Sequence, residues 1–144
     1  MNTKHKGDIA EQAAALQALR RSWSVSRPVG DNQPYDLIFD ISGALVKVQV
    51  KSAWLDAPSG NDVVDNRRTK TNRRVMLRGA YAPADFDFAL VYPQELNLFY
   101  VFPVEAFIRY GSEIHIVEGE KRQRRPASAA FRDAWELIAR HAAT

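Results

Sequence analysis

The chain has 144 residues, of which 46% are hydrophobic, so we expect a single domain over residues 1–144 with its own apolar core. It contains no cysteine, which excludes disulfides, thiolate zinc sites and cysteine nucleophiles. The formal net charge of +3 is only mildly basic, no stretch is long and apolar enough to span a membrane, and the polar start does not resemble a signal peptide, so we expect a cytoplasmic protein.

The first predicted element is a helix over residues 8–21. Asp8 followed by Glu11 has the form of a capping box, and an apolar stripe with helical spacing follows. Residues 23–29 are expected to form a strand or an extended approach to one. Residues 30–34 contain glycine, asparagine and proline, which are typical of a turn.

A β-hairpin is predicted over residues 35–51. Residues 35–41 and 44–51 are both strand-like, and Ser42-Gly43 between them has the length and the glycine of a two-residue loop. Pairing the strands around that loop gives residue numbers that sum to about 85 across the ladder. This register predicts that Asp36 lies opposite Gln49.

The alternation of side chains sorts this hairpin into two faces. One face is apolar and is expected in the core: Leu37, Phe39, Ile41, Val46, Val48 and Val50. The other face carries Asp36, Lys47, Gln49 and Lys51. A carboxylate, an amide oxygen and an ammonium group close together are the groups that a metal-dependent phosphodiesterase needs.

The remaining elements follow from turn residues, apolar patterning and length. They are a long polar loop over 55–74, a short strand over 75–81, a strand pair over 86–92 and 98–102, a short helix over 103–110, a short strand over 114–117, and a final amphipathic helix over 128–141 with Phe131, Trp135 and Ile138 inward. The aromatic residues of the middle region alternate along strands and are expected in the core: Tyr81, Phe86, Phe88, Tyr92, Phe99, Tyr100 and Phe102.

Two segments concentrate positive charge. One contains Arg67, Arg68, Lys70, Arg73, Arg74 and Arg78, and the other contains Lys121, Arg122, Arg124 and Arg125. Runs of charge are usually solvated surface. Clustering of this kind favours contact with phosphates, because each neutralised phosphate releases counterions.

The polar residues of the hairpin and helix also have ordinary explanations. Glu11 can bond to a free N–H at the helix start, Asp36 can close a turn, and Gln49 and Lys51 can be the solvated side of a hairpin. Against this, aspartate is depleted in strands, and a plain hairpin requires no aspartate opposite a glutamine. The three histidines lie too far apart in sequence to suggest a metal site: His5, His115 and His141.

A helix glutamate, a carboxylate at the start of one hairpin strand and (D/E)-x-K on the next strand form the pattern of the PD-(D/E)xK nuclease superfamily, and this chain resembles it. The matching residues are Glu11, Asp36 and Lys51. The chain holds glutamine at position 49, where the common form has a carboxylate. This Q-x-K variant, with Gly-Asp-Asn before Tyr-Asp, is similar to the small homing endonucleases encoded in bacterial group I introns. The motifs span about the first third of the chain.

The resemblance implies an α/β fold of the restriction-endonuclease type, with a mixed central sheet flanked by the N-terminal and C-terminal helices. It implies that Glu11, Asp36, Gln49 and Lys51 are catalytic and that the first three hold Mg²⁺ or Mn²⁺. Lys51 would orient or help to deprotonate the attacking water and offset negative charge in the transition state.

The resemblance also implies that the substrate is double-stranded DNA, contacted by the arginine-rich segment that begins at Arg67. Cutting two strands needs two sites, so one site per chain implies a homodimer, and that branch of homing endonucleases suggests a homotetramer. The expected location is the nucleoid of a bacterium or of a phage-infected cell.

Two alternatives remain open at this point. The nearer is a junction-resolving or defence-system nuclease of the same fold, which would recognise a structured substrate in place of a sequence. The farther is a DNA-binding module that keeps the fold without turnover, and the neutral Gln49 is the feature that allows it.

Overall fold

The computed structural model describes residues 2–65, 67–71, 76–111, 113–118 and 126–144, with backbone only at 67–71 and 76–79. The elements are α1 (Thr3–Arg20), β1 (Ser24–Ser26), β2 (Leu37–Ile41), β3 (Ala44–Asp56), β4 (Asn61–Asp65), β5 (Arg67–Thr71), β6 (Met76–Ala80), β7 (Phe88–Pro93), β8 (Tyr100–Pro103), α2 (Val104–Arg109), β9 (Glu113–Ile116), the 3₁₀ helix η1 (Ala127–Phe131) and α3 (Glu136–Ala142).

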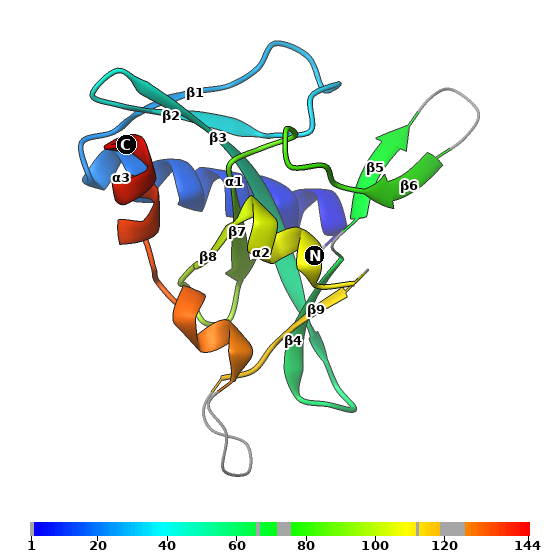
Figure 1. The fold of residues 1–144 in the computed structure, drawn as a ribbon. Helices are drawn as coiled ribbons and strands as arrows, with labels where there is room; N and C mark the ends of the chain where they lie inside the picture. The colour runs from blue at the N-terminus through cyan, green and yellow to red at the C-terminus, as the bar shows by residue number, and fades with distance from the viewer. Residues whose placement is uncertain (1, 66, 72–75, 112, 119–125) are drawn as a thin grey trace.

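The central sheet is mixed, as predicted. It contains seven strands: the path β1-β2-β3-β4-β9 is antiparallel, β7 runs parallel to β3, and β8 pairs antiparallel with β7. A separate ribbon of two strands, β5 and β6, extends away from this sheet (Figure 1). The long strand β3 is the centre of the molecule, because β2, β4 and β7 all pair with it.

Helices cover both faces of the sheet. On one face, the buried alanines of α1 and residues Trp135 and Ile138 near the C-terminus pack on Phe39, Val48 and their neighbours. On the other face, α2 contributes Phe107 to a second apolar cluster with the aromatic residues of β8. All seven aromatic residues assigned to the core from the sequence are buried.

The β2–β3 hairpin confirms the predicted register. Leu37 pairs with Val48 and Ile38 with Lys47, so the numbers sum to 85 as expected. Ser42 and Gly43 both have positive φ, 52° and 93°, which is the backbone of a type I′ turn and matches the twist of the strands. The core face is also confirmed, since Leu37, Phe39, Val46, Val48 and Val50 are buried and Ile41 packs against them.

The predicted start of the first helix is wrong. Helix α1 begins at Thr3, and the cap is Asn2, whose side chain accepts a hydrogen bond of 2.8 Å from the N–H of His5. Asp8 and Glu11 therefore lie inside the helix and do not form a capping box. The polar first turn carries no apolar stripe, which is why the sequence pattern missed it.

The predicted polar loop over 55–74 is wrong as well. Strand β3 continues to Asp56, turns at Gly60 (φ 72°), and is followed by β4 and then by β5. The Oδ2 atom of Asp56 fixes this turn by accepting hydrogen bonds from the backbone and hydroxyl of Ser59. Strands β4 and β5 each span only five residues. Strand β4 has two adjacent valines between polar residues and β5 has no apolar residue, so alternation gave no signal.

The final helix predicted over 128–141 is divided. The 3₁₀ helix η1 ends at Phe131, and α3 begins at Glu136. Between them Asp133 has a φ of 51° and its N–H bonds at 2.8 Å to the carbonyl of Phe99, the residue before β8. Arg132 also forms a β-bridge with Tyr100 of β8, so contacts at the start of β8 interrupt the helix. The other predicted strands and the short helix α2 are confirmed within two residues at their N-terminal ends. No helix in the described part of the chain is long and apolar enough to cross a membrane.

Candidate active site at the edge of strand β3

The site forms where β2 separates from β3. The last residue of β3 that pairs with β2 is Val48, and β7 runs along the opposite edge, where Gln49 pairs with Ala89 and Lys51 with Val91. Beyond Val48, the backbone groups of β3 that face the β2 side no longer have a strand to pair with, so they need another hydrogen-bond partner. The carboxylate of Asp36 provides it.

Asp36 is tied to β3 by two backbone contacts. Its own N–H donates to the carbonyl of Val48 at 2.8 Å, and its Oδ2 accepts from the N–H of Val50 at 2.8 Å. The side chain of Gln49 completes the arrangement, because its Nε2 donates to the same Oδ2 at 2.9 Å and to the Val50 carbonyl at 3.3 Å. The predicted contact between Asp36 and Gln49 is therefore present.

Lys51 lies on the same side of β3 as Gln49. Its Nζ is 5.2 Å from the centre of the Tyr81 ring, a distance at which the ring face attracts an ammonium group. Burial raises the pKa of Asp36, and the positive charge of Lys51 opposes that rise, so the two side chains act on each other. Lys47 has the same orientation but a different environment, because its Nζ donates to the carbonyl of Ala84 at 2.8 Å.

Glu11 reaches the site from α1. Its Oε1 accepts a hydrogen bond of 3.1 Å from Nη1 of Arg27. Burial raises the pKa of Glu11, and the negative charge of Asp36 raises it further, while Arg27 lowers it. The structure thus brings together the four residues that the sequence analysis selected. It adds Arg27, which is 16 positions from Glu11 and belongs to no motif that could have indicated it.

The electrostatics of this cluster fit a divalent cation. Burial raises the pKa of Asp36, and the Val50 N–H, Lys51 and Arg27 only partly offset that effect. Glu11 and Asp36 therefore ionise at a cost that a bound cation would remove, and carboxylate and amide oxygens are the donors that Mg²⁺ prefers. Throughout the part of the chain that the structure describes, no three His, Cys, Asp or Glu side chains form a metal cluster, so a cation here depends on two carboxylates and the neutral Gln49.

Other charged residues have different positions. Asp87 accepts from the backbone N–H of Lys47 at 2.8 Å and lies 3.9 Å from Nε2 of His141, so it supports the hairpin outside the cluster. Arg67, Arg68 and Lys70 belong to β5 and Arg78 belongs to β6. The remaining residues of the two basic segments lie outside the described part of the chain: Arg73, Arg74, Lys121, Arg122, Arg124 and Arg125.

A helix glutamate, an aspartate at a strand edge and a Gln-x-Lys strand on a mixed α/β fold are the elements of a nuclease active site of the PD-(D/E)xK type. The chain belongs to the family of PD-(D/E)XK endonucleases, which matches residues 1–138. It is therefore a nuclease, and nucleases of this family generally use divalent metal ions.

The fold is similar to a solved structure described as a bacterial homing endonuclease, I-Ssp6803I. The two chains are 58% identical, the match covers 99% of this chain and 97% of the other, and the TM-score is 0.91. The restriction-endonuclease-like fold expected from the sequence is thereby confirmed. None of the curated proteins matches this chain.

Proposed function

We propose that this chain is a site-specific DNA endonuclease of the homing type, dependent on Mg²⁺ or Mn²⁺, with Glu11, Asp36, Gln49 and Lys51 as its catalytic residues. The observation that carries the proposal is the position of Asp36, which is fixed by Val50 and Gln49 at an open strand edge beside Lys51. The homing assignment rests on the described activity of the structural relative.

We assign the cation to Glu11, Asp36 and Gln49. When bound, it would polarise the scissile phosphate and make its bound water more acidic. The Oδ2 of Asp36 already accepts two hydrogen bonds, so Oδ1 is the oxygen that we assign to the cation. Since Gln49 is neutral, the site carries less negative charge than an all-carboxylate version and should bind Mg²⁺ more weakly.

Lys51 is assigned to the attacking water and to the developing negative charge on the phosphate. The ring of Tyr81 holds its ammonium group at one side of the site, so less freedom is lost when substrate arrives. Arg27 keeps Glu11 in position through the hydrogen bond between them.

The β5–β6 ribbon is the element that we assign to DNA binding. A two-stranded ribbon fits the major groove of B-DNA, and this one extends from the body of the molecule (Figure 1). Its described part carries Arg67, Arg68, Lys70 and Arg78, and Arg73 and Arg74 lie in the segment between its strands. Cleavage of both strands requires two such chains, so we propose a homodimer or homotetramer as the active form.

The test uses a DNA duplex that the wild-type protein has selected from a random-sequence library. Cleavage of this duplex is then measured for the wild type and for variants. Lys51→Ala should lose cleavage and keep DNA binding, because the ammonium acts on the reacting phosphate. Lys47→Ala is the matched control, since Lys47 lies on the same strand and face but bonds to Ala84. Excess EDTA should stop the wild type.

Undiminished cleavage in EDTA, or a Lys51→Ala variant as fast as the Lys47→Ala control, would refute the metal-dependent mechanism. Preference for branched DNA over every linear duplex would identify a junction-resolving enzyme. Tight binding of the selected duplex with no cleavage by the wild type would identify a binding module.

The ribbon is tested by the salt dependence of binding. Replacing Arg67 and Arg68 by alanine should reduce the slope of log affinity against log salt by about one unit per lost phosphate contact. The double variant Arg109→Ala, Arg140→Ala removes equal charge from α2 and α3 and serves as control. Equal slopes for the two double variants would exclude the ribbon as the phosphate-binding element. If the double variant Arg67→Ala, Arg68→Ala instead loses about 1–3 kcal/mol of discrimination at particular base pairs, the arginines read bases and not phosphates.

A further inference from the structure

Arg27 connects the edge of the central sheet to the candidate active site. It directly follows β1, and Ser26 of β1 pairs with Ile38, so Arg27 lies at the start of β2, close to Asp36. Its Nη1 donates a hydrogen bond of 3.1 Å to Oε1 of Glu11. The side chains of Arg27 and Glu11 are 43% and 30% exposed, so this ion pair is open to solvent.

The charge of Arg27 acts on both carboxylates of the site. Burial and the charge of Asp36 raise the pKa of Glu11, and Arg27 opposes that rise. Burial raises the pKa of Asp36, and Arg27 is one of the groups that oppose this rise too. Arg27 therefore stabilises the same two carboxylates that we assign to the cation. A cationic side chain and a divalent cation that stabilise the same charges compete, because each reduces what the other gains.

Arg27 also has the chemistry of a phosphate ligand. The planar guanidinium group presents several N–H donors in a fork that matches two oxygens of a phosphate, and the bond to Glu11 uses one of these donors. An ion pair as exposed as this one contributes little to stability. The side chain of Arg27 can therefore exchange Glu11 for a phosphate at small cost.

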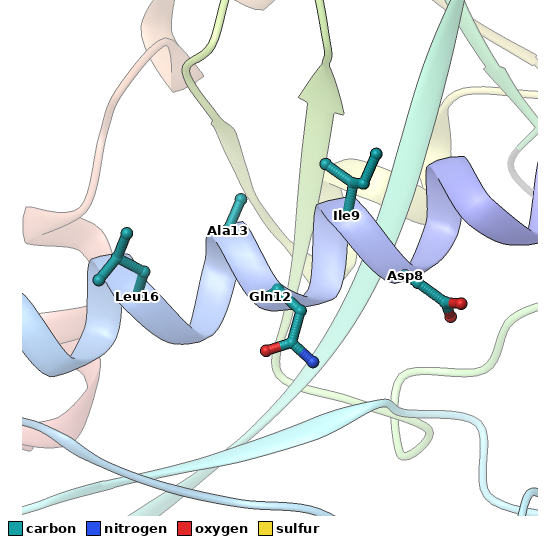
Figure 2. A pocket seen from close by; sticks show the side chains of 5 residues that line it. All are labelled: Asp8, Ile9, Gln12, Ala13 and Leu16. Carbon is teal, nitrogen blue, oxygen red and sulfur yellow. The ribbon is translucent and has the colours of Figure 1, made fainter. Parts of the chain in front are cut away.

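The hollow on α1 beside Glu11 is unsuited to a phosphate. Figure 2 shows its lining side chains, which all come from this one helix: Asp8, Ile9, Gln12, Ala13 and Leu16. One of them is a carboxylate and the others are uncharged, and Asp8 is close enough to Glu11 for their charges to interact. A phosphate on this side of Glu11 would meet repulsion, whereas on the side of Arg27 it would meet a guanidinium group.

We propose that Arg27 is a phosphate-binding residue that Glu11 holds until a divalent cation binds, after which Arg27 contacts a DNA phosphate beside the scissile one. The inference rests on the proposed function, because it takes Glu11 and Asp36 as ligands of the cation. It adds a residue that couples the two binding events, since the cation takes over Glu11 and leaves the guanidinium group available to DNA.

The first test measures Mg²⁺ binding without DNA by isothermal titration at pH 8, well above the ordinary pKa of a glutamate. Arg27→Gln should bind Mg²⁺ about fivefold more tightly than wild type, because the competing positive charge is gone. Arg27→Lys keeps the charge and should stay near the wild-type affinity. Equal or weaker binding by Arg27→Gln would show that the arginine only positions Glu11, and it would overturn the proposal.

The second test measures binding of the selected duplex by proteins that all carry Lys51→Ala, so that the DNA is not cut. Adding Arg27→Gln should weaken binding about tenfold with Mg²⁺ but less than about twofold in EDTA, where Glu11 holds the arginine. Arg132→Gln is the matched control, because the pair of Arg132 with Glu118 has the same distance of 3.1 Å and similar exposure. Its effect should not depend on Mg²⁺. An effect of Arg27→Gln that is equal in Mg²⁺ and in EDTA would overturn the proposal.

The third test frees Arg27 without a cation. In EDTA, Glu11→Gln should bind the selected duplex about fivefold more tightly than wild type, because the guanidinium group is released to a phosphate. The double variant Glu11→Gln, Arg27→Gln should lose this gain. These measurements record binding alone, so their outcome does not depend on whether the wild-type protein cleaves. A gain that persists in the double variant would come from the loss of negative charge at Glu11 and would overturn the role of Arg27.

Discussion

Asp36 and Asp62 are two aspartates at or on strands that pair with β3, and burial raises the pKa of both. Their surroundings are opposite. Asp36 accepts hydrogen bonds from the Val50 N–H and from Gln49, with Lys51 and Arg27 nearby. Asp62 is 5% exposed, its Oδ1 has no hydrogen-bond partner among the described residues, and the groups that act on it are the carboxylates of Glu95 and Glu118.

The difference shows which surroundings allow a buried carboxylate to bind a metal ion. Burial and a hydrogen bond with Glu95 raise the pKa of Asp62 to about 7, so near neutral pH it holds a proton for much of the time, while the same bond lowers the pKa of Glu95. Donors and cations around Asp36 favour its ionised form, which is the form that can bind a metal. Burial alone therefore does not identify the site, and the identity of the neighbours does.

Replacement of each aspartate by asparagine should give the largest contrast. Asp36→Asn keeps an oxygen for the Val50 N–H but loses the charge, so we expect a fall of about 10²–10⁴ in cleavage rate, equivalent to several kcal/mol of transition-state stabilisation. Asp62→Asn should cleave at the wild-type rate. Single-turnover cleavage of the selected duplex measures both, and equal losses would erase the distinction between the two carboxylates.

Substitutions of Gln49 should have the next largest effect on the cleavage rate. Gln49→Leu removes both the amide oxygen and the donor to Asp36, and it should lose cleavage about 10²-fold. Gln49→Glu restores an oxygen but places a second carboxylate against Asp36, which raises the pKa of Asp36 further. Its activity should therefore persist and require a higher pH than the wild type.

The pH profile of cleavage measures this shift. Because the pKa values of Glu11 and Asp36 are raised, protons compete with the cation, and higher Mg²⁺ should move the acid limb of the profile to lower pH. Full activity of Gln49→Leu would reduce the site to Glu11, Asp36 and Lys51.

Asp62 should have a smaller effect, on stability. Its folded-state pKa of about 7 lies above the ordinary value of about 4, so the folded protein keeps a proton that the unfolded chain releases. The stability that this contributes is fully present below about pH 4 and is lost as the pH rises through about 7. Asp62→Asn should be more stable than wild type at pH 8 by about 1–2 kcal/mol, a figure reduced from the full shift for solvent screening.

Urea unfolding of wild type and Asp62→Asn at pH 5 and at pH 8 checks this prediction. The stabilising effect of the substitution should grow with pH. An effect that is equal at both values would mean that Asp62 carries no proton in the folded state.

Tyr81 should give the smallest effect. Tyr81→Leu removes the ring face beside Lys51, and we expect the maximal rate to fall about fivefold, from a contact worth about 1 kcal/mol. Tyr81→Phe retains the ring and should stay near the wild-type rate. A leucine variant that equals the phenylalanine variant in rate and pH profile would show that the ring does not position the ammonium group.

The hairpin could be predicted because its information is local. Ser42-Gly43 defined the turn, the turn fixed the register, and the register placed Asp36 beside Gln49. The start of α1 was missed because a single residue, Asn2, caps it. The break before α3 was missed because a contact with Phe99 causes it, and no local pattern records a contact over that distance in sequence.

The neighbours of the residues that we propose as catalytic could not be predicted for the same reason. Arg27 meets Glu11 only after α1 packs beside the sheet, and Tyr81 meets Lys51 only after the chain returns from the ribbon. Asp62 carried no sequence signal either, since its raised pKa comes from burial in the folded protein and from Glu95 and Glu118 on later segments. The sequence thus indicated the residues that we propose as catalytic, and the fold determines which residues surround them.

The most direct test of the central claim, that Asp36 at the edge of β3 holds the catalytic cation, is Mg²⁺ binding by isothermal titration to wild type, Asp36→Asn and Asp62→Asn. We predict that wild type and Asp62→Asn bind Mg²⁺ with similar affinity and release protons on binding at mildly acidic pH, and that Asp36→Asn shows no comparable binding. Binding of Mg²⁺ to Asp36→Asn with wild-type affinity, or its loss in Asp62→Asn alone, would contradict the claim.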